Sequence, residues 1–291
     1  MIVSLNGEYL DRTRATVSVS DRGFLFGDGV YEVTRARDGR LFEAARHLRR
    51  LARGLEALGI ALPPGLDSAT LLEISERLLH ENGLEQGDAT IYLQITRGAA
   101  EPRTHHFPPA GTPPTVFLSA SRLIVPDDLH ARGVTAITTP DLRWERCDLK
   151  TVQLLANVLA KQQAVAAGAF EAIFVREALA IEGASANLLA VIDGAIRTHP
   201  ADHRILPGVT REVVIELARE LGLGVSEAPL PLRELSGASE LLLTATTVDV
   251  MPVVRVDGRT VGDGRPGPVA RQLQAGLRAR LVRDTTRAPA L

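Results

Sequence analysis

Three Asp-Gly pairs, each placed between two extended runs, constrain the fold of this chain more than any other feature. They are Asp38-Gly39, Asp193-Gly194 and Asp257-Gly258. Asp-Gly is a strong hairpin signal because a type I′ turn needs positive φ at both central residues, which Asp and Gly tolerate. The flanking runs are rich in β-branched and apolar residues, as half-buried strands are. We therefore predict that antiparallel pairing is common.

Further periodic runs extend this prediction along the chain. Strands are predicted over 15–19, 30–37, 89–97, 115–121, 133–138, 170–176, 187–192, 239–245 and 253–256. Helices are predicted over 43–58, 69–82, 151–167, 209–221 and 267–282. No Gly-rich dinucleotide fingerprint accompanies a βαβ repeat, which argues against a Rossmann fold.

The length of 291 residues is enough for two domains of ordinary size. We expect an α/β (α+β) protein with mixed, mainly antiparallel sheets. The expected parts are a smaller N-terminal α/β domain at 1–119, a connector at 120–127 and a larger C-terminal domain at 128–291.

Composition excludes several classes of protein. The formal net charge of −2 gives no reason to expect nucleic acid or an anionic membrane as a partner. No window approaches the roughly 18 apolar residues that a membrane span needs. Cys147 is the single cysteine, so an intrachain disulfide is impossible. Together with an N-terminus that lacks a signal-peptide pattern, this leads us to expect a cytoplasmic protein.

Lysine is almost absent from the chain. Only two of its 33 basic residues are lysines, Lys150 and Lys161, in the stretch RCDLKTVQLLANVLAKQQ. Lys150 stands where an extended run meets a predicted helix with apolar first turns, and apolar surroundings favour a neutral, nucleophilic amine. Such an amine forms a Schiff base with an aldehyde, whereas a guanidinium stays protonated. The alternative is a surface lysine without a function. We interpret Lys161, mid-helix beside two glutamines, as a solvated residue.

The segment RILPGVTREVV at 204–214 indicates an anion site. A helix that opens at Val209 and Thr210 presents free N–H groups and the positive end of its dipole, and Thr210 adds a hydroxyl. Ordinary helix capping explains the same pattern. A second hydroxyl cluster, TATT at 244–247, follows an apolar run, and Arg50 is a candidate for the charge that a phosphate needs.

Glu182 lies at the end of a predicted strand, before Gly183 in the segment IEGASAN. If buried, this carboxylate needs a partner, and the protonated nitrogen of a pyridine ring would serve. A solvated glutamate at the edge of a strand is equally consistent with the sequence.

A Pro-rich loop around 102–114 contains the sequence PRTHHF. Arg103 and His105 are two residues apart, so on extended backbone they point the same way and suit a carboxylate. His105 and His106 are also possible metal ligands, but no acidic or Cys partner lies at ligand spacing. We expect no metal site.

Taken together, the motifs resemble a known family over nearly the whole length. They are DRGFLFGDGVYEV, HLRRL, YLQITRG, PRTHHFP, LRWERCDLK with the following LLANVLAKQ, EAIFVRE, EGASANL, ILPGVTR and TATTVDVMPV. The chain resembles the class IV (fold type IV) pyridoxal-phosphate-dependent aminotransferases, and within them the D-amino-acid transaminases. The resemblance implies pyridoxal 5′-phosphate as cofactor and a two-domain fold whose larger C-terminal domain is a pseudo-barrel.

The resemblance also implies a role for each matching residue. Lys150 matches the Schiff-base lysine, which also moves the proton of the substrate α-carbon. Glu182 matches the carboxylate that pairs with the pyridine nitrogen, and Leu206 the residue packed against the ring. The phosphate cup is matched by Arg50, Val209, Thr210 and Thr246, and Ser185 is a further cofactor contact. The trap for the substrate α-carboxylate is matched by Tyr31, Arg103 and His105.

The implied reaction moves the amino group of a D-amino acid, such as D-alanine or D-glutamate, to a 2-oxo acid. In such enzymes Arg103 and His105 reach in from the neighbouring subunit, so the resemblance implies a homodimer. Four alternatives stay open: a branched-chain L-amino-acid transaminase, an (R)-amine transaminase, an aminodeoxychorismate lyase, and a non-enzymatic carrier of the cofactor. The chain departs from the family at Ala184, Ala186 and Ala245, where serines are common.

Overall fold

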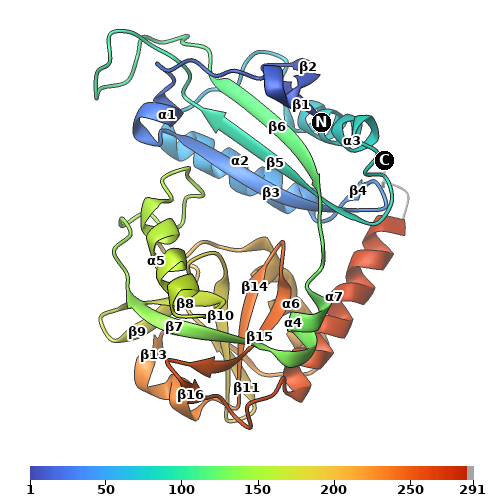
Figure 1. Ribbon diagram of the computed structural model, residues 1–291, viewed down its shortest axis with the longest axis vertical. Coiled ribbons are helices and arrows are strands. Elements are labelled where there is room, and N and C mark those ends of the chain that lie inside the picture. The colour runs from blue at the N-terminus through green and yellow to red at the C-terminus, as the bar shows by residue number, and fades with distance from the viewer. Residues whose placement is uncertain (287–291) are drawn as a thin grey trace. The chain divides into compact units, whose positions relative to one another are not determined.

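A computed structural model of the chain describes residues 1–286. The chain divides into two compact units (Figure 1). Within the described residues, the first consists of Met1–Ile124, Leu149–Gln153 and residues 284–286, and the second of Val125–Asp148 and Leu154–Arg283. The short segment Leu149–Gln153 therefore groups with the first unit, although the chain on both sides of it belongs to the second. The predicted domain limits at 119/120 and 127/128 stay a prediction.

The first unit is built on a six-stranded antiparallel sheet with the order β2-β1-β6-β5-β3-β4. Its strands are β1 (Ile2–Leu5), β2 (Glu8–Asp11), β3 (Gly29–Arg37), β4 (Arg40–Leu41), β5 (Asp88–Thr96) and β6 (Thr115–Arg122). Its helices are η1 (Arg12–Arg14), α1 (Arg22–Phe26), α2 (Ala44–Leu58) and α3 (Ser68–Glu81). Helices α2 and α3 pack on the sheet (Figure 1), and apolar side chains from the sheet and from both helices form one core.

The second unit is built on a ten-stranded mixed sheet with the order β12-β11-β10-β14-β15-β7-β8-β9-β13, in which β16 also pairs with β15. Its strands are β7 (Val134–Pro140), β8 (Glu171–Arg176), β9 (Leu179–Gly183), β10 (Asn187–Ile192), β11 (Ala195–Thr198), β12 (Val225–Glu227), β13 (Leu230–Pro231), β14 (Glu240–Ala245), β15 (Asp249–Val256) and β16 (Arg259–Thr260). Most pairs are antiparallel, as predicted, and β7 pairs in parallel with both β8 and β15.

This sheet curls on itself. Strands β9 and β10 lie on opposite sides of β15 in the strand order, yet only residues 184–186 join them, and Gly183 N–H donates to Ala186 O (2.7 Å). The helices of the unit are α4 (Asp127–Arg132), α5 (Leu155–Ala166), α6 (Val209–Glu220), η2 (Leu232–Gly237) and α7 (Pro268–Thr286). Buried residues of the strands fill the inside of the curl.

The Asp-Gly prediction is confirmed at all three places. Asp38-Gly39 joins β3 to β4, Asp193-Gly194 joins β10 to β11, and Asp257-Gly258 joins β15 to β16. The φ angles of the three Asp residues lie between 48° and 50°, and those of the Gly residues between 74° and 78°, as type I′ turns require.

Two predicted elements are wrong or displaced. Residues 15–19 form no strand, and Thr16–Val19 are exposed. The helix predicted from 151 begins only at Leu155. This displacement places Lys150 away from a helix start and beside the sheet of the first unit.

Candidate active site

Lys150 lies on extended backbone beside the first half of β3. Tyr31 N–H donates to Lys150 O (3.0 Å), Val152 N–H donates to Gly29 O (3.0 Å), and Val30 forms an antiparallel bridge with Thr151. Main-chain groups of this segment are hydrogen-bonded to β3, so they are not available for the first turn of a helix. Helix α5 therefore begins only after the segment, at Leu155. The pairing fixes the main chain at Lys150, whose Nζ lies 4.2 Å from the centroid of the Tyr31 ring.

A buried charge network lies on the neighbouring residue of β3. Glu32 is 1% exposed and accepts hydrogen bonds from Arg50 Nε (2.7 Å) and Arg50 Nη2 (2.8 Å). His47 Nδ1 lies 2.8 Å from the same carboxylate. Burial alone would raise the pKa of Glu32, but Arg50 and His47 lower it to about 2. The network therefore holds Arg50 in one orientation on α2.

Tyr31 lies next to this network and is itself largely buried. Burial raises the pKa of its phenol, and the nearby charge of Arg50 offsets part of that effect. Tyr31 therefore stays a neutral hydrogen-bond donor at physiological pH. Within the first unit, the fold thus places Tyr31, Lys150 and the Arg50 network close to one another.

Arg103 and His105 lie on the exposed loop between β5 and β6. The Arg103 guanidinium carbon is 4.5 Å from the centroid of the Phe26 ring, and the His105 ring meets the same ring edge-on with its centroid 5.6 Å away. The two side chains that were predicted to point the same way therefore converge on one aromatic ring. Figure 1 shows this loop running out beyond α1.

In the second unit, Glu182 is buried at the end of β9. Its carboxylate accepts hydrogen bonds from Arg143 Nη1, from Asn187 Nδ2 (2.8 Å) and from Leu206 N–H (3.2 Å to Oε2). Asn187 also donates to Leu206 O (2.8 Å), so the three residues 182, 187 and 206 form a closed set. Burial raises the pKa of Glu182 to about 7, and Arg143 offsets only part of that effect. The alternative interpretation, a solvated glutamate at the edge of a strand, is excluded. Because Arg143 offsets only part of the effect of burial, a second cationic partner would further stabilise the ionised carboxylate.

The raised pKa of Glu182 makes the stability of the ligand-free protein depend on pH. The carboxyl titrates at 4.5 when unperturbed and at about 7 in the fold, so its ionised form is disfavoured in the fold. The stability it contributes is fully present below the unfolded pKa and is lost as pH rises through the folded pKa. Between pH 4.5 and pH 7.5 we expect the wild type to lose roughly 2–4 kcal/mol relative to Glu182→Gln. Urea unfolding of both ligand-free proteins at the two pH values measures this, and equal losses would contradict it.

The start of α6 has the features of an anion site. The N-cap is Gly208, which has no side chain that could accept a hydrogen bond from the first turn of the helix. The N–H groups of Val209 and Thr210 are therefore left for another acceptor. A Cβ on Gly208 would lie 2.0 Å from Asn187 Oδ1, which requires glycine here. Thr246 lies in the turn between β14 and β15, half-buried. The predicted opening of this helix is confirmed.

Ser185, itself exposed, belongs to a second polar network around the buried Glu171, and this network corrects the interpretation of Lys161. Glu171 is fully buried and accepts a hydrogen bond from Ser185 Oγ (2.6 Å), and Lys161 Nζ lies 3.3 Å from the same carboxylate oxygen. Lys161 also donates to Phe170 O. Asn157, one turn earlier on α5, donates to Ala184 O (2.8 Å). Lys161 is thus not a simply solvated residue, because with Asn157 it supports the turn that follows Glu182.

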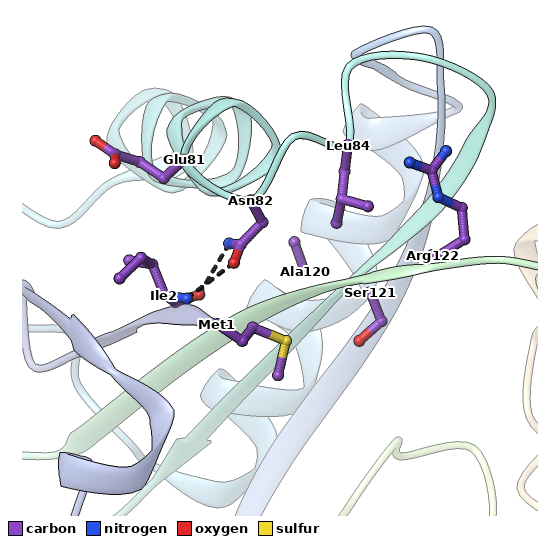
Figure 2. A pocket seen from close by; sticks show the side chains of 8 residues that line it. All are labelled: Met1, Ile2, Glu81, Asn82, Leu84, Ala120, Ser121 and Arg122. Carbon is purple, nitrogen blue, oxygen red and sulfur yellow. Dashed lines mark hydrogen bonds between the residues drawn. The ribbon is translucent and has the colours of Figure 1, made fainter.

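A surface pocket of about 430 Å³ lies elsewhere in the first unit, between β1, β6 and the end of α3. Figure 2 shows how Asn82 closes one side by pairing with both main-chain groups of Ile2. The pocket is lined by none of the predicted site residues. Within residues 1–286, no group of three or more His, Cys, Asp and Glu side chains has the arrangement of a metal site. No helix in the same range combines the length and hydropathy of a membrane span.

Sequence comparison relates the chain to a family of enzymes. The class IV aminotransferase family matches residues 29–256. A D-alanine aminotransferase of Staphylococcus haemolyticus is 43% identical over 275 residues, which cover 94% of this chain and 96% of that protein. A D-alanine aminotransferase of Bacillus licheniformis is 40% identical over 287 residues, 99% of each chain.

Solved structures agree with this relationship. The branched-chain amino acid aminotransferase of Escherichia coli matches with a TM-score of 0.86 and 27% identity over 99% of this chain and 97% of that one. A branched-chain amino acid aminotransferase solved with pyridoxamine 5′-phosphate matches with a TM-score of 0.87 and 28% identity over 97% and 94%. The predicted fold type IV architecture is thereby confirmed. The chain belongs to the class IV aminotransferases, enzymes that depend on pyridoxal 5′-phosphate.

Proposed function

We propose that this aminotransferase acts on D-amino acids, such as D-alanine and D-glutamate, and passes the amino group to a 2-oxo acid. The observation that carries the proposal is the PRTHHF loop, which brings Arg103 and His105 against one Phe26 ring. A guanidinium fork and an imidazole together suit a carboxylate. Relatives at 40–43% identity that are named D-alanine aminotransferases support the same substrate class.

The residues present fit pyridoxal phosphate. The chain offers a lysine amine on fixed backbone, a buried carboxyl of raised pKa that favours a cationic partner, and a helix start whose N–H groups suit a phosphate. When bound, this cofactor supplies an aldehyde for amines and a ring that withdraws electrons from the substrate α-carbon. We assign the covalent attachment to Lys150 Nζ.

The other cofactor contacts follow from the same chemistry. Ionised Glu182 would be the partner of the protonated ring nitrogen, and Arg143 and Asn187 hold its carboxylate in one orientation. Leu206 would pack against the ring of the bound cofactor. Its phosphate would be held by four residues: Arg50, Val209, Thr210 and Thr246. Ser185, whose hydroxyl donates to Glu171, would add a further cofactor contact beside Glu182.

Lys150 also moves protons. Its neutral amine takes the proton from the substrate α-carbon and returns a proton in the opposite half-reaction. The backbone pairing with β3 and the Tyr31 ring restrict the directions that this side chain can take. Tyr31, Arg103 and His105 fix the substrate α-carboxylate, so only one enantiomer presents its α-hydrogen to Lys150.

We further propose that the enzyme is a homodimer. Helix α5 exposes an apolar stripe formed by Leu155, Val158, Leu159 and Val165, whose side chains are 56–72% exposed. Their spacing places them on one helical face. A contiguous exposed stripe of this kind is typical of an interaction surface. A second copy of the chain is the proposed partner, because the resemblance to D-amino-acid transaminases implies that Arg103 and His105 act in the neighbouring subunit.

We also propose that the protein is located in the cytoplasm. Cys147, the single cysteine of the chain, is buried, and burial raises the pKa of its thiol to about 11. An unreactive, unpaired thiol is compatible with a reducing compartment.

The second candidate is a branched-chain L-amino-acid aminotransferase, because solved structures with TM-scores of 0.86 and 0.87 carry that name. The test compares D-alanine, L-leucine and (R)-1-phenylethylamine as amino donors to 2-oxoglutarate and pyruvate. We expect kcat/KM for D-alanine to exceed the value for either other donor by about 10²-fold or more, since only D-alanine combines a carboxylate with the favoured hand. Faster turnover of L-leucine would overturn the proposal in favour of the second candidate.

A further inference from the structure

Arg22 holds the backbone of the PRTHHF loop. This arginine is 5% exposed and donates from Nη1 to Thr104 O (2.8 Å) and His106 O (3.3 Å), and from Nη2 to His105 O (3.3 Å). One guanidinium thus bonds three successive carbonyls. The main chain bends at His105 and His106, which lets these three carbonyls face one guanidinium, and the bonds that hold this bend also fix the directions of Arg103 and His105.

The charge of Arg22 is balanced by Asp28, which it shares with Arg97. Arg22 Nε donates to Asp28 Oδ2 (2.9 Å), and Arg97 donates to both oxygens of Asp28 (2.8 and 2.9 Å). Burial alone would raise the pKa of Asp28, but hydrogen bonds from Arg97 and Arg22 bring it below its ordinary value. Arg97 is tied to the end of α2 through Leu58 O (2.7 Å), and its guanidinium carbon lies 3.6 Å from the centroid of the Phe107 ring. The loop is therefore connected to the sheet and to α2.

Phe26 completes the arrangement. The guanidinium carbon of Arg22 lies 4.7 Å from the centroid of this ring, which Arg103 and His105 also contact. Helix α1, which carries both Arg22 and Phe26, is capped by the Asp21 side chain. Asp21 also accepts hydrogen bonds from Thr96 (2.9 Å) and Thr115 (2.6 Å), so α1 is fixed to β5 and β6.

We propose that Arg22 is a positioning residue for recognition of the substrate α-carboxylate, through the loop that carries Arg103 and His105. The inference rests on the proposed function, in which these two side chains bind that carboxylate. Arg22 itself touches neither substrate nor cofactor in this proposal. Arg22 holds the loop in its binding conformation before the carboxylate arrives, and this lowers the conformational entropy that is lost on binding.

The test is the Arg22→Met variant of the complete enzyme with its cofactor. The fold is expected to survive because Asp28 keeps its two-point contact with Arg97. We expect KM for D-alanine and for 2-oxoglutarate to rise about tenfold or more, kcat to change less than about threefold, and cofactor affinity to stay unchanged. The inhibition constant of propionate, a carboxylate without an amino group, should rise in step with KM.

Arg22→Lys is the second variant, and it keeps a charge opposite Asp28. A single ammonium on a flexible stem lacks the planar fork that reaches three carbonyls, so a smaller rise in KM is expected. Arg77→Met is the matched control. Arg77 also lies over an aromatic ring (3.8 Å from the Tyr9 centroid) but is exposed and distant in sequence from the loop, so KM should not change.

Three outcomes would overturn the inference. One is an unchanged KM in both Arg22 variants. Another is a fall in kcat and cofactor affinity as large as the rise in KM, since this would indicate a general structural role. The third is additivity of Arg22→Met with Arg103→Ala, because an effect that acts through Arg103 and His105 must shrink when Arg103 is absent. If Arg103→Ala alone leaves carboxylate binding intact, the proposed function fails instead, and the two failures are thus distinguished.

Discussion

Replacing Lys150 with alanine is expected to abolish transamination and the visible absorbance of lysine-bound pyridoxal phosphate. The side chain supplies both the covalent attachment and the base for the α-proton, so we expect kcat to fall by at least about 10³-fold. Cofactor binding through the phosphate contacts should persist, because those residues are unchanged. The measurement is the rate with D-alanine and 2-oxoglutarate, recorded beside the spectrum of the purified protein.

The matched control uses the other lysine of the chain. Lys150→Arg keeps the positive charge but should be as inactive as Lys150→Ala, because a guanidinium stays protonated and forms no imine. Lys161→Arg should keep the absorbance, since arginine can still pair with Glu171. If Lys150→Arg retained normal turnover, the assignment of Lys150 would be wrong.

Local signals predicted much of the fold because the chemistry of turns and helix starts is local. The three Asp-Gly hairpins and the start of α6 depend on backbone angles that a few residues determine. The hairpin between β1 and β2 uses the same chemistry at Asn6-Gly7, whose φ angles are 52° and 86°. That pair carries the same signal and would have revealed both strands, which the sequence interpretation missed.

Pairing between segments that are distant in sequence could not be predicted from the sequence. The run 15–19 has the composition of a strand, but no neighbour pairs with it in the described part of the chain, and propensity alone does not make a strand. Conversely, residues 151–154 continue a helical pattern, yet Val152 N–H is bonded to Gly29 O. Tertiary hydrogen bonds override local preference at the very segment that carries Lys150.

In the candidate site, too, local signals were predictable and long-range contacts were not. The chemistry of single side chains predicted Lys150, Glu182 and Arg103, but the buried partners of such residues come from distant parts of the chain. Glu32 is the clearest omission, a buried carboxylate between Tyr31 and Val33 of β3 that orients Arg50. A charged residue in that setting is the signal that would have found it, because burial without a partner is too costly.

The second large effect is expected from Arg103→Ala. Loss of the guanidinium removes a charge-assisted, two-point contact to the substrate α-carboxylate, which is common to the amino acid and the 2-oxo acid. We expect kcat/KM for both substrates to fall by about 10²-fold, mainly through KM, while cofactor affinity stays the same. Steady-state kinetics with each substrate varied in turn, together with a cofactor titration, measures the split.

His106→Ala is the control for Arg103→Ala. His106 is also exposed on the same loop, and among residues 1–286 its ring bonds only to the neighbouring carbonyl of Phe107 (2.9 Å). Its removal tests whether any truncation in this loop disturbs binding, and KM should stay within about twofold of the wild type. The preference for D-alanine over L-alanine adds a readout that general damage would not change. If Arg103 fixes the carboxylate on one side of the cofactor ring, its loss must lower this preference as well as affinity, whereas parallel losses of substrate and cofactor affinity would identify Arg103 as structural.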